Sequence, residues 1–142
     1  RLYTEYAMNH ITNSFRVLTE LDHVRIDRLL SRKGQAGDTL NELLDDADIV
    51  PPRQVPGDVV TMYTRVIVLD LADGAQRTLT LCYPEDADAS AGFVSVLSPI
   101  GTALLGRRAG EETQWTTPTG AVQRLRIVEL LFQPEASGDY TR

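Results

Sequence analysis

Few residues of this 142-residue chain are of the types that usually carry out catalysis. There is one cysteine, Cys82, and there are two histidines, His10 and His23. Cys82 falls in a stretch that alternates apolar and polar residues, so we interpret it as a small half-buried strand residue. Neither histidine lies in a motif that would pair a nucleophile with a base. The sequence therefore predicts no catalytic residue, no structural zinc site and no intramolecular disulfide.

The densest group of carboxylates is Asp45, Asp46 and Asp48. On a helix, Asn41, Asp45 and Asp48 would share the side opposite the leucines of the same segment. Carboxylate oxygens are suitable ligands for Mg²⁺. Runs of charge usually form solvated helix faces, however, so we interpret this group in that way and expect neither a metal nor a cofactor.

A third chemical possibility is a phosphate-binding loop around Gly101, Gly106 and Gly110, but these glycines lack the following Lys-Ser/Thr. Ser98 is instead a favourable N-cap, and Pro99 suits the first turn of a helix, where its missing N–H costs little. Gly106 can adopt the left-handed conformation that follows a helix. We therefore expect a short structural helix between Ser98 and Gly106.

Charge and hydropathy exclude two further classes of protein. Twenty acidic and 14 basic residues give a formal net charge of −6, which argues against a protein that coats nucleic acid. No segment has the roughly 20 apolar residues needed to span a bilayer. The first residues do not resemble a signal peptide, and a single cysteine fits a reducing compartment, so we expect a cytoplasmic protein. We treat residues 1–18 as an uncertain leader.

Two short amphipathic helices are predicted in residues 19–50. Thr19 can cap the first helix, and Asp38 or Thr39 can cap the second, which has an apolar stripe reaching Val50. About twelve residues each correspond to about 18 Å, so the pair would be a stub of an antiparallel coiled coil. Pro51 and the other prolines of residues 51–57 predict a linker.

Beyond the linker the pattern changes to one typical of strands. Apolar or alternating runs predict strands at 66–71, 77–83, 93–97 and 123–132. Asp73-Gly74 and the segment 117–120 supply turns between them. The expected fold is therefore α+β: a short helical hairpin, then a small antiparallel β domain at 58–134 with one short helix, and a tail at 135–142.

The segment Val96–Gly106 resembles the C-terminal domain of the bacterial Gre transcript-cleavage factors. In that family a Ser-Pro-Ile-Gly element precedes a Gly-acidic pair, a strand and a Pro-x-Gly turn, which correspond here to Gly110-Glu111 and Thr117–Gly120. Thr119 replaces the first glycine of the usual turn. The resemblance covers about residues 58–134 and implies an FKBP-like fold for the β domain.

A second resemblance, to the regulator of nucleoside diphosphate kinase (Rnk) family, extends from about residue 19 onward. It rests on Leu21–Asp27, on Asp58–Met62, on Tyr83-Pro84 and on the ending Gln133–Tyr140. Members of this family resemble Gre factors with a shortened coiled coil. The resemblance implies binding to RNA polymerase at its secondary channel, and it implies no kinase chemistry.

The tip of the expected hairpin argues against transcript cleavage. Gre factors carry two acidic residues there, which help to hold a catalytic Mg²⁺ in the polymerase. Here the tip has a single acid, Asp38, next to Arg32 and Lys33. We therefore expect a non-enzymatic regulator of transcription that competes with Gre-type factors without stimulating cleavage.

Two surfaces are expected to contact the partner, at the hairpin tip and around the short helix. These residues are Arg32, Lys33, Gln35 and Asp38, and then Ser98, Pro99, Ile100, Gly101, Leu104, Leu105, Arg107 and Arg108. For the two arginines, solvated loop charges are an equally good interpretation. The alternative function is an FKBP-like prolyl isomerase or chaperone-like module, but a fold alone does not carry that activity.

Overall fold

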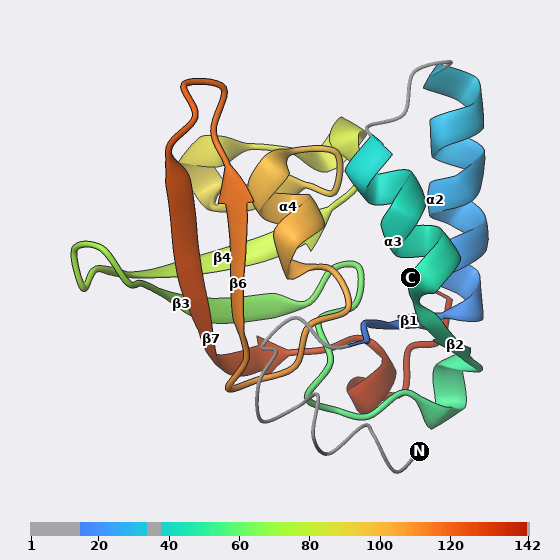
Figure 1. The fold of residues 1–142 in the computed structure, drawn as a ribbon. Coiled ribbons are helices and arrows are strands. Elements are labelled where there is room, and N and C mark those ends of the chain that lie inside the picture. The colour runs from blue at the N-terminus through green and yellow to red at the C-terminus, as the bar shows by residue number, and fades with distance from the viewer. Residues whose placement is uncertain (1–14, 34–37, 142) are drawn as a thin grey trace, which may run out of the picture.

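The computed structural model describes residues 15–33 and 38–141 (Figure 1). Its architecture is α+β, as the sequence predicted. In chain order the helices and strands are β1 (Val17–Thr19), α2 (Glu20–Lys33), α3 (Asp38–Asp46), β2 (Asp48–Val50), β3 (Arg65–Asp70), β4 (Gln76–Cys82), β5 (Phe93–Ser95), α4 (Pro99–Leu104), β6 (Glu112–Thr116) and β7 (Val122–Phe132).

The central element is a curled five-stranded sheet with the strand order β5-β4-β3-β7-β6. Most neighbours are antiparallel, but β4 and β5 pair in parallel, so the prediction of a purely antiparallel domain is wrong at this edge. The parallel pair is possible because the residues between β4 and β5 form a long crossover rather than a tight turn. Register shifts between β3 and β7 mark irregularities of the kind that bend a sheet.

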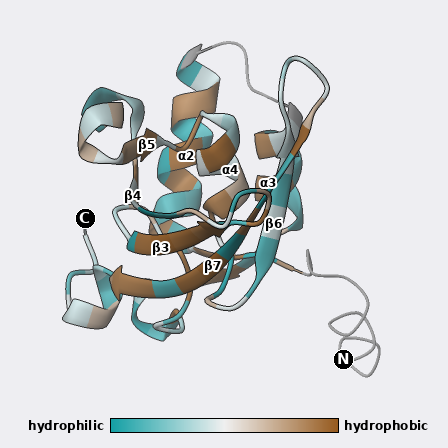
Figure 2. Ribbon diagram, turned by 90° about the vertical axis from the view of Figure 1, so that its left-hand side faces the viewer, coloured by the Kyte–Doolittle hydropathy of each residue, from teal (hydrophilic) through white to brown (hydrophobic). Residues whose placement is uncertain are grey.

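The main strands form where the apolar patterns placed them. Val66 and Val68 of β3 are fully buried, and so is Leu81 of β4. The predicted turn at Asp73-Gly74 is confirmed: Gly74 has a φ of 76°, and the Asp73 carboxylate accepts a hydrogen bond from the Ala75 N–H at 2.9 Å. Figure 2 shows the resulting contrast, with β3 largely hydrophobic and β6 largely hydrophilic.

Both helices predicted in residues 19–50 are present as α2 and α3, but α3 is shorter than expected. The Thr19 cap is confirmed, because its Oγ1 accepts a hydrogen bond from the Asp22 N–H at 3.0 Å. The prediction that the second helix reaches Val50 is wrong. Residues 48–50 instead form β2, which pairs in parallel with β1, a partner about 30 residues upstream that a local helical pattern does not reveal. Asp48 therefore does not share a helix face with Asp45.

The expected boundary of a leader after residue 18 is also wrong, because it falls inside β1. Leu18 is 1% exposed and belongs to the hydrophobic core. Val17 donates a backbone hydrogen bond to Gly106 O at 3.1 Å. Residues 15–18 are thus an integral part of the fold, whereas residues 1–14 lie outside the described residues.

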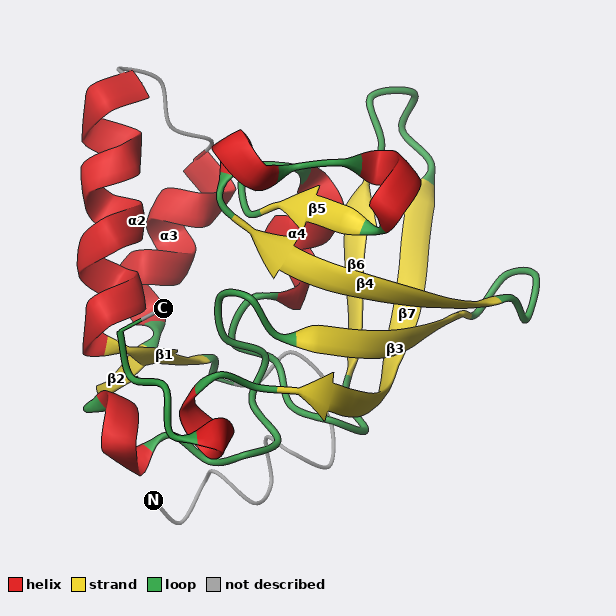
Figure 3. Cartoon of the chain, turned by 180° about the vertical axis from the view of Figure 1, so that it is seen from behind, coloured by secondary structure: helices red, strands yellow, loops and turns green. Residues whose placement is uncertain are grey.

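The helix pair shares one hydrophobic core with the sheet. Leu29 and Leu30 of α2 and Leu44 of α3 pack in the same buried cluster as Val66 and Leu81. Figures 1 and 3 show α2 and α3 side by side along one edge of the β unit. The predicted linker is held as well, since the Gln133 side-chain amide donates hydrogen bonds to Pro56 O and Val59 O at 2.8 and 2.7 Å. The helices therefore cover the β unit and do not form a separate arm.

Within the described part of the chain, no helix is long and apolar enough to cross a membrane.

Candidate functional site

The segment around α4 has the capped geometry that the sequence predicted. The Ser98 hydroxyl accepts a hydrogen bond from the Gly101 N–H at 3.1 Å and donates one to Ser95 O at 2.6 Å. Gly106 has a φ of 77°, in the left-handed region. A Cβ at Gly101 would lie only 1.9 Å from Ser95 O, so this position requires glycine. The Ser-Pro-Ile-Gly residues thus set how closely α4 approaches the end of β5.

Half of the residues expected to contact a partner here are buried in the fold. Leu104 and Leu105 are fully buried, Gly101 is buried, and Arg107 is only 4% exposed. The prediction of a partner surface is therefore wrong for these four residues. The physical reason is that α4 has only six residues and packs its apolar side chains into the core. Burial also lowers the pKa of the Arg107 guanidinium.

A groove of about 580 Å³ lies between α4, α3 and β6, and Pro99 is the one predicted contact residue among the described residues that line it. Pro99 is exposed and lines this groove, Ser98 and Ile100 are half-buried, and Arg108 is exposed. We call this surface the α4 groove; its lining includes Leu40, Leu97, Pro99, Gln114 and Trp115. With Leu97 37% exposed, the groove offers an apolar contact surface.

Arg16 lines the α4 groove and binds backbone carbonyls of the α4 segment, a role that the sequence did not predict. Its guanidinium donates hydrogen bonds to Thr102 O and to Leu105 O, the latter at 3.1 Å. Burial lowers the pKa of Arg16 to about 9, so the group stays charged at neutral pH. A cation at these carbonyls satisfies the C-terminal end of α4. Because Arg16 lay in the segment interpreted as a leader, only the fold shows its role.

The hairpin tip is described only in part. Arg32 is exposed, and Lys33 and Asp38 are the residues at which α2 ends and α3 begins. Gln35 lies outside the described residues. Asp45 and Asp46 are exposed, in keeping with a solvated helix face. Among the described residues, no group of three or more His, Cys, Asp or Glu side chains is arranged to hold a metal ion.

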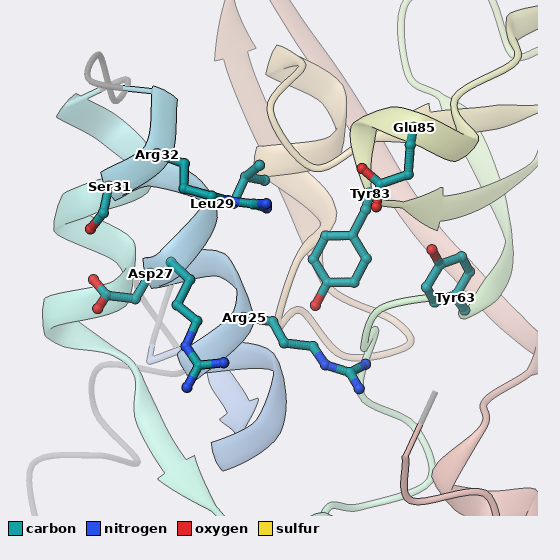
Figure 4. Close-up of a pocket in the computed structure, with 9 residues that line it drawn as sticks. Arg25, Asp27, Leu29, Ser31, Arg32, Tyr63, Tyr83 and Glu85 are labelled. Carbon is teal, nitrogen blue, oxygen red and sulfur yellow. The ribbon is translucent and has the colours of Figure 1, made fainter.

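A second groove, of about 810 Å³, lies between α2 and the β unit. We call it the arginine groove. It is lined on the helix side by Arg25, Asp27, Arg28, Leu29, Ser31 and Arg32, and on the other side by Tyr63, Tyr83 and Glu85. Figure 4 shows Arg25 and Arg32 extending toward the tyrosines, whereas Asp27 and Ser31 point away from them. No short sequence motif marks this groove, because its two sides are about 40 residues apart in the chain.

Asp22 joins α2 to the β unit next to Tyr63, a residue of the arginine groove. It is 1% exposed, and its Oδ2 accepts a hydrogen bond from the Met62 N–H at 3.1 Å. Burial raises the pKa of Asp22 to about 7, although the Met62 hydrogen bond opposes this shift. A buried carboxyl group therefore contacts the backbone next to Tyr63 and titrates near neutral pH.

Comparison with known proteins agrees with this arrangement. Residues 55–131, more than half of the chain, match the family model described as transcription elongation factor GreA/GreB, C-terminal. The solved structure of a prokaryotic transcription elongation factor GreA/GreB from Nitrosomonas europaea is similar, with a TM-score of 0.69 and 37% identity. The match covers 82% of this chain and 99% of that one. The β unit is therefore a GreA/GreB-type C-terminal domain.

A more complete match distinguishes this chain from GreA itself. It is 44% identical over 128 residues to the regulator of nucleoside diphosphate kinase from Escherichia coli strain K12, which covers 87% of this chain and 94% of that protein. GreA from Desulfotalea psychrophila is 35% identical over 91 residues, which cover 56% of its length. The chain belongs to the Rnk family, and its GreA/GreB-type domain relates it to transcription elongation factors.

Proposed function

We propose that this protein binds RNA polymerase at its secondary channel and competes with Gre-type factors without stimulating transcript cleavage. The observation that carries the proposal is the combination of a GreA/GreB-type C-terminal domain with a helix pair of only 14 and nine residues. The longer helix measures about 21 Å at 1.5 Å per residue. A pair of this size, packed along the β unit, offers little reach into a deep channel.

The α4 groove is the proposed docking surface on the β unit. Leu97 and Pro99 are exposed beside the half-buried Trp115, so an apolar residue of the partner can be buried between them. The exposed Arg108 adds a positive charge near the end of α4. Aromatic and apolar residues at the centre with charges around them are typical of protein interfaces.

The hairpin tip is the proposed second contact, with Arg32, Lys33, Gln35 and Asp38 directed toward the polymerase. A single acid beside two bases does not reproduce a paired carboxylate site for Mg²⁺, which supports binding without cleavage. A cytoplasmic location accompanies this proposal, because the proposed partner is RNA polymerase.

Competition on a paused elongation complex tests the proposal. The full chain is expected to co-purify with core polymerase and to reduce cleavage stimulated by a Gre factor, while producing no cleavage itself. Leu97→Asp should weaken both effects, and Val122→Asp, at an exposed apolar residue on β7, is the matched control. Absence of binding at micromolar concentrations would overturn the proposal, as would cleavage that depends on Asp38.

The isomerase alternative gains no support. The relatives are named as regulators or transcription factors, and the FKBP-like character of the β unit stays a prediction from resemblance. We therefore do not pursue it.

A further inference from the structure

The arginine groove has positive charge concentrated on its helix side. Arg25, Arg28 and Arg32 follow one another at spacings of three and four residues, so they occupy one face of α2. They extend over about 10 Å of the helix axis. Like charges at such spacings destabilise a helix. An anion lying along this face would remove that repulsion.

The charge of this face contrasts with that of the whole chain. The protein has a formal net charge of −6, yet three guanidinium groups line one groove. Arg25 is partly engaged, because it donates a hydrogen bond to Thr141 O at 3.0 Å. Arg28 and Arg32 are exposed side chains. Guanidinium groups bind phosphate oxygens in a bidentate manner, which makes these two residues the best candidates to bind a phosphate chain.

The second notable feature is an aromatic pair opposite the arginines. The rings of Tyr63 and Tyr83 lie 5.8 Å apart between centroids at an interplanar angle of 58°. Tyr83 is buried, while Tyr63 is half-buried and lines the groove. An aromatic ring in a groove next to arginines can stack on a nucleobase whose phosphates reach the guanidinium groups.

The surrounding structure holds the backbone of Tyr63 in an unfavourable conformation, and this fixes the position of its ring. Tyr63 has a φ of 65°, and it is the one residue other than glycine with a positive φ among the described residues. Such a conformation is strained for any residue other than glycine. It is held by a hydrogen bond from the Tyr63 N–H to Leu81 O at 2.6 Å and by one from its hydroxyl to Asp86. Residues in such strained conformations persist only where the surrounding structure fixes them, and they cluster at active and ligand-binding sites.

We propose that the arginine groove binds a nucleoside di- or triphosphate, with the base against Tyr63 and the phosphates along Arg28 and Arg32. The volume of about 810 Å³ is within the range of small-molecule sites and suits a single nucleotide. The ligand is a small molecule and not RNA polymerase, so the proposal goes beyond the proposed function, and Arg32 is the one residue that the two proposals share.

Two carboxylates also line the groove and must be compatible with this ligand. Asp27 points away from the tyrosines, so it does not face the bound phosphates (Figure 4). Glu85 lies on the tyrosine side of the groove, next to Tyr83 (Figure 4). A carboxylate accepts hydrogen bonds from amino and imino groups; adenine and cytosine carry an amino group, and guanine offers both kinds of donor. Guanosine phosphates are therefore the first ligands to test.

Isothermal titration calorimetry of the full chain tests the proposal with three probes: GTP, guanosine without phosphates, and inorganic tripolyphosphate without a base. GTP is expected to bind more tightly than either fragment. Arg28→Ala combined with Arg32→Ala should weaken GTP binding about tenfold or more, because it removes charge-assisted hydrogen bonds. Both changes place alanine on an exposed helix face, where folding is retained. Arg77→Ala, at an exposed position of β4, is the matched control and should change nothing.

Tyr63→Gly separates the two halves of the site. Glycine adopts a positive φ without strain, so the variant keeps the backbone while removing the ring. It should weaken GTP binding several-fold through lost stacking and leave tripolyphosphate binding unchanged. The proposal is overturned if GTP shows no binding up to about 1 mM. It is also overturned if tripolyphosphate binds as tightly as GTP, or if a polyglutamate peptide binds more tightly, which would assign the groove to an acidic polypeptide.

Discussion

The two grooves beside the helix pair are built in different ways. The α4 groove lies against α3, and its key geometry comes from one short run, Ser98 to Gly106, in which cap, proline and glycines are close in sequence. The arginine groove lies against α2 and combines that helix with Tyr63 and Tyr83, far along the chain. Local residues determine the α4 segment that forms one wall of the first groove, whereas no local motif determines either wall of the second.

This difference predicts how each region responds to substitution. Around α4, single local changes should alter stability strongly, because backbone atoms are in close contact there. At the interface of α2 with the β unit, the response should depend on charge and on pH. The following predictions test this contrast, from the largest expected effect to the smallest.

Gly101→Ala should be the most damaging change. Its Cβ would lie 1.9 Å from Ser95 O, a backbone atom that cannot move without distorting β5 and α4. We expect the free energy of unfolding to fall by about 3 kcal/mol or more, measured by urea denaturation. Gly57→Ala is the matched control, because its Cβ would meet only Ala136 Cβ at 3.9 Å. Equal losses in the two variants would contradict a tight approach at Gly101.

Arg16→Met tests a contact between the residue that precedes β1 and α2 and the carbonyls of the α4 segment. Methionine keeps the apolar part of the side chain but leaves Thr102 O and Leu105 O without this donor. We expect a loss of about 2 kcal/mol in the free energy of unfolding. Arg77→Met, at an exposed position, should cost little. Similar losses in both variants would show that the hydrogen bonds of Arg16 to the α4 segment do not stabilise the fold.

Asp22→Asn tests the pH response of the helix–sheet interface. The carboxyl pKa is about 7 in the folded protein and about 3.9 in an unfolded chain, so the folded state binds the proton more tightly. Stability of the natural chain should therefore fall as pH rises from about 4 to 7 and then level off, by about 2 kcal/mol or more.

Asparagine does not titrate, and its side-chain oxygen can still accept the hydrogen bond from the Met62 N–H. The Asp22→Asn variant should match the natural chain at pH 4 and exceed its stability at pH 8, as measured by thermal unfolding across pH. Asp27→Asn, at an exposed position of the same helix, should keep the natural pH profile. A profile unchanged by Asp22→Asn would show that this carboxyl group does not titrate near neutral pH.

Ser98→Ala should have the smallest effect of the four. It removes the cap that accepts a hydrogen bond from the Gly101 N–H, which is worth about 1 kcal/mol. Ser31→Ala, on the exposed surface of α2, should be neutral or slightly stabilising because alanine favours helix. Chemical denaturation distinguishes the two variants, and a neutral Ser98→Ala would mean that the cap adds nothing to the stability of α4.

The sequence allowed prediction of the features that neighbouring residues determine. Ser98, Gly106 and the Asp73-Gly74 turn each depend on residues within a few positions, and the structure has them as expected. Apolar and alternating runs likewise located β3, β4, β5 and β7, but not β1, β2 or β6. The helix and strand patterns together predicted the α+β arrangement, and the family resemblance supplied the relation to Rnk and GreA/GreB factors, which the comparisons confirm.

Features that depend on distant partners were missed or misjudged. Residues 48–50 continue a helical pattern, but pairing with β1 makes them a strand. Arg107 was expected on the surface, because a charged residue in a loop carries no sign of its burial. The arginine groove was not predicted, since Tyr63 and Tyr83 come together with α2 only after the helix packs on the sheet. Depth of burial and long-range pairing are therefore what the local sequence lacks.

The short parallel ladder of β1 and β2 has a consequence for how a partner is engaged. It ties the beginning of α2 to the end of α3, and both helices share their core with the sheet. The α4 groove and the tip end of α2, which are the two proposed contacts with the polymerase, are therefore held at a fixed spacing before the partner arrives. Association then loses little internal freedom, so most of the contact energy is available as affinity, and a partner whose two contact points do not match this spacing is rejected.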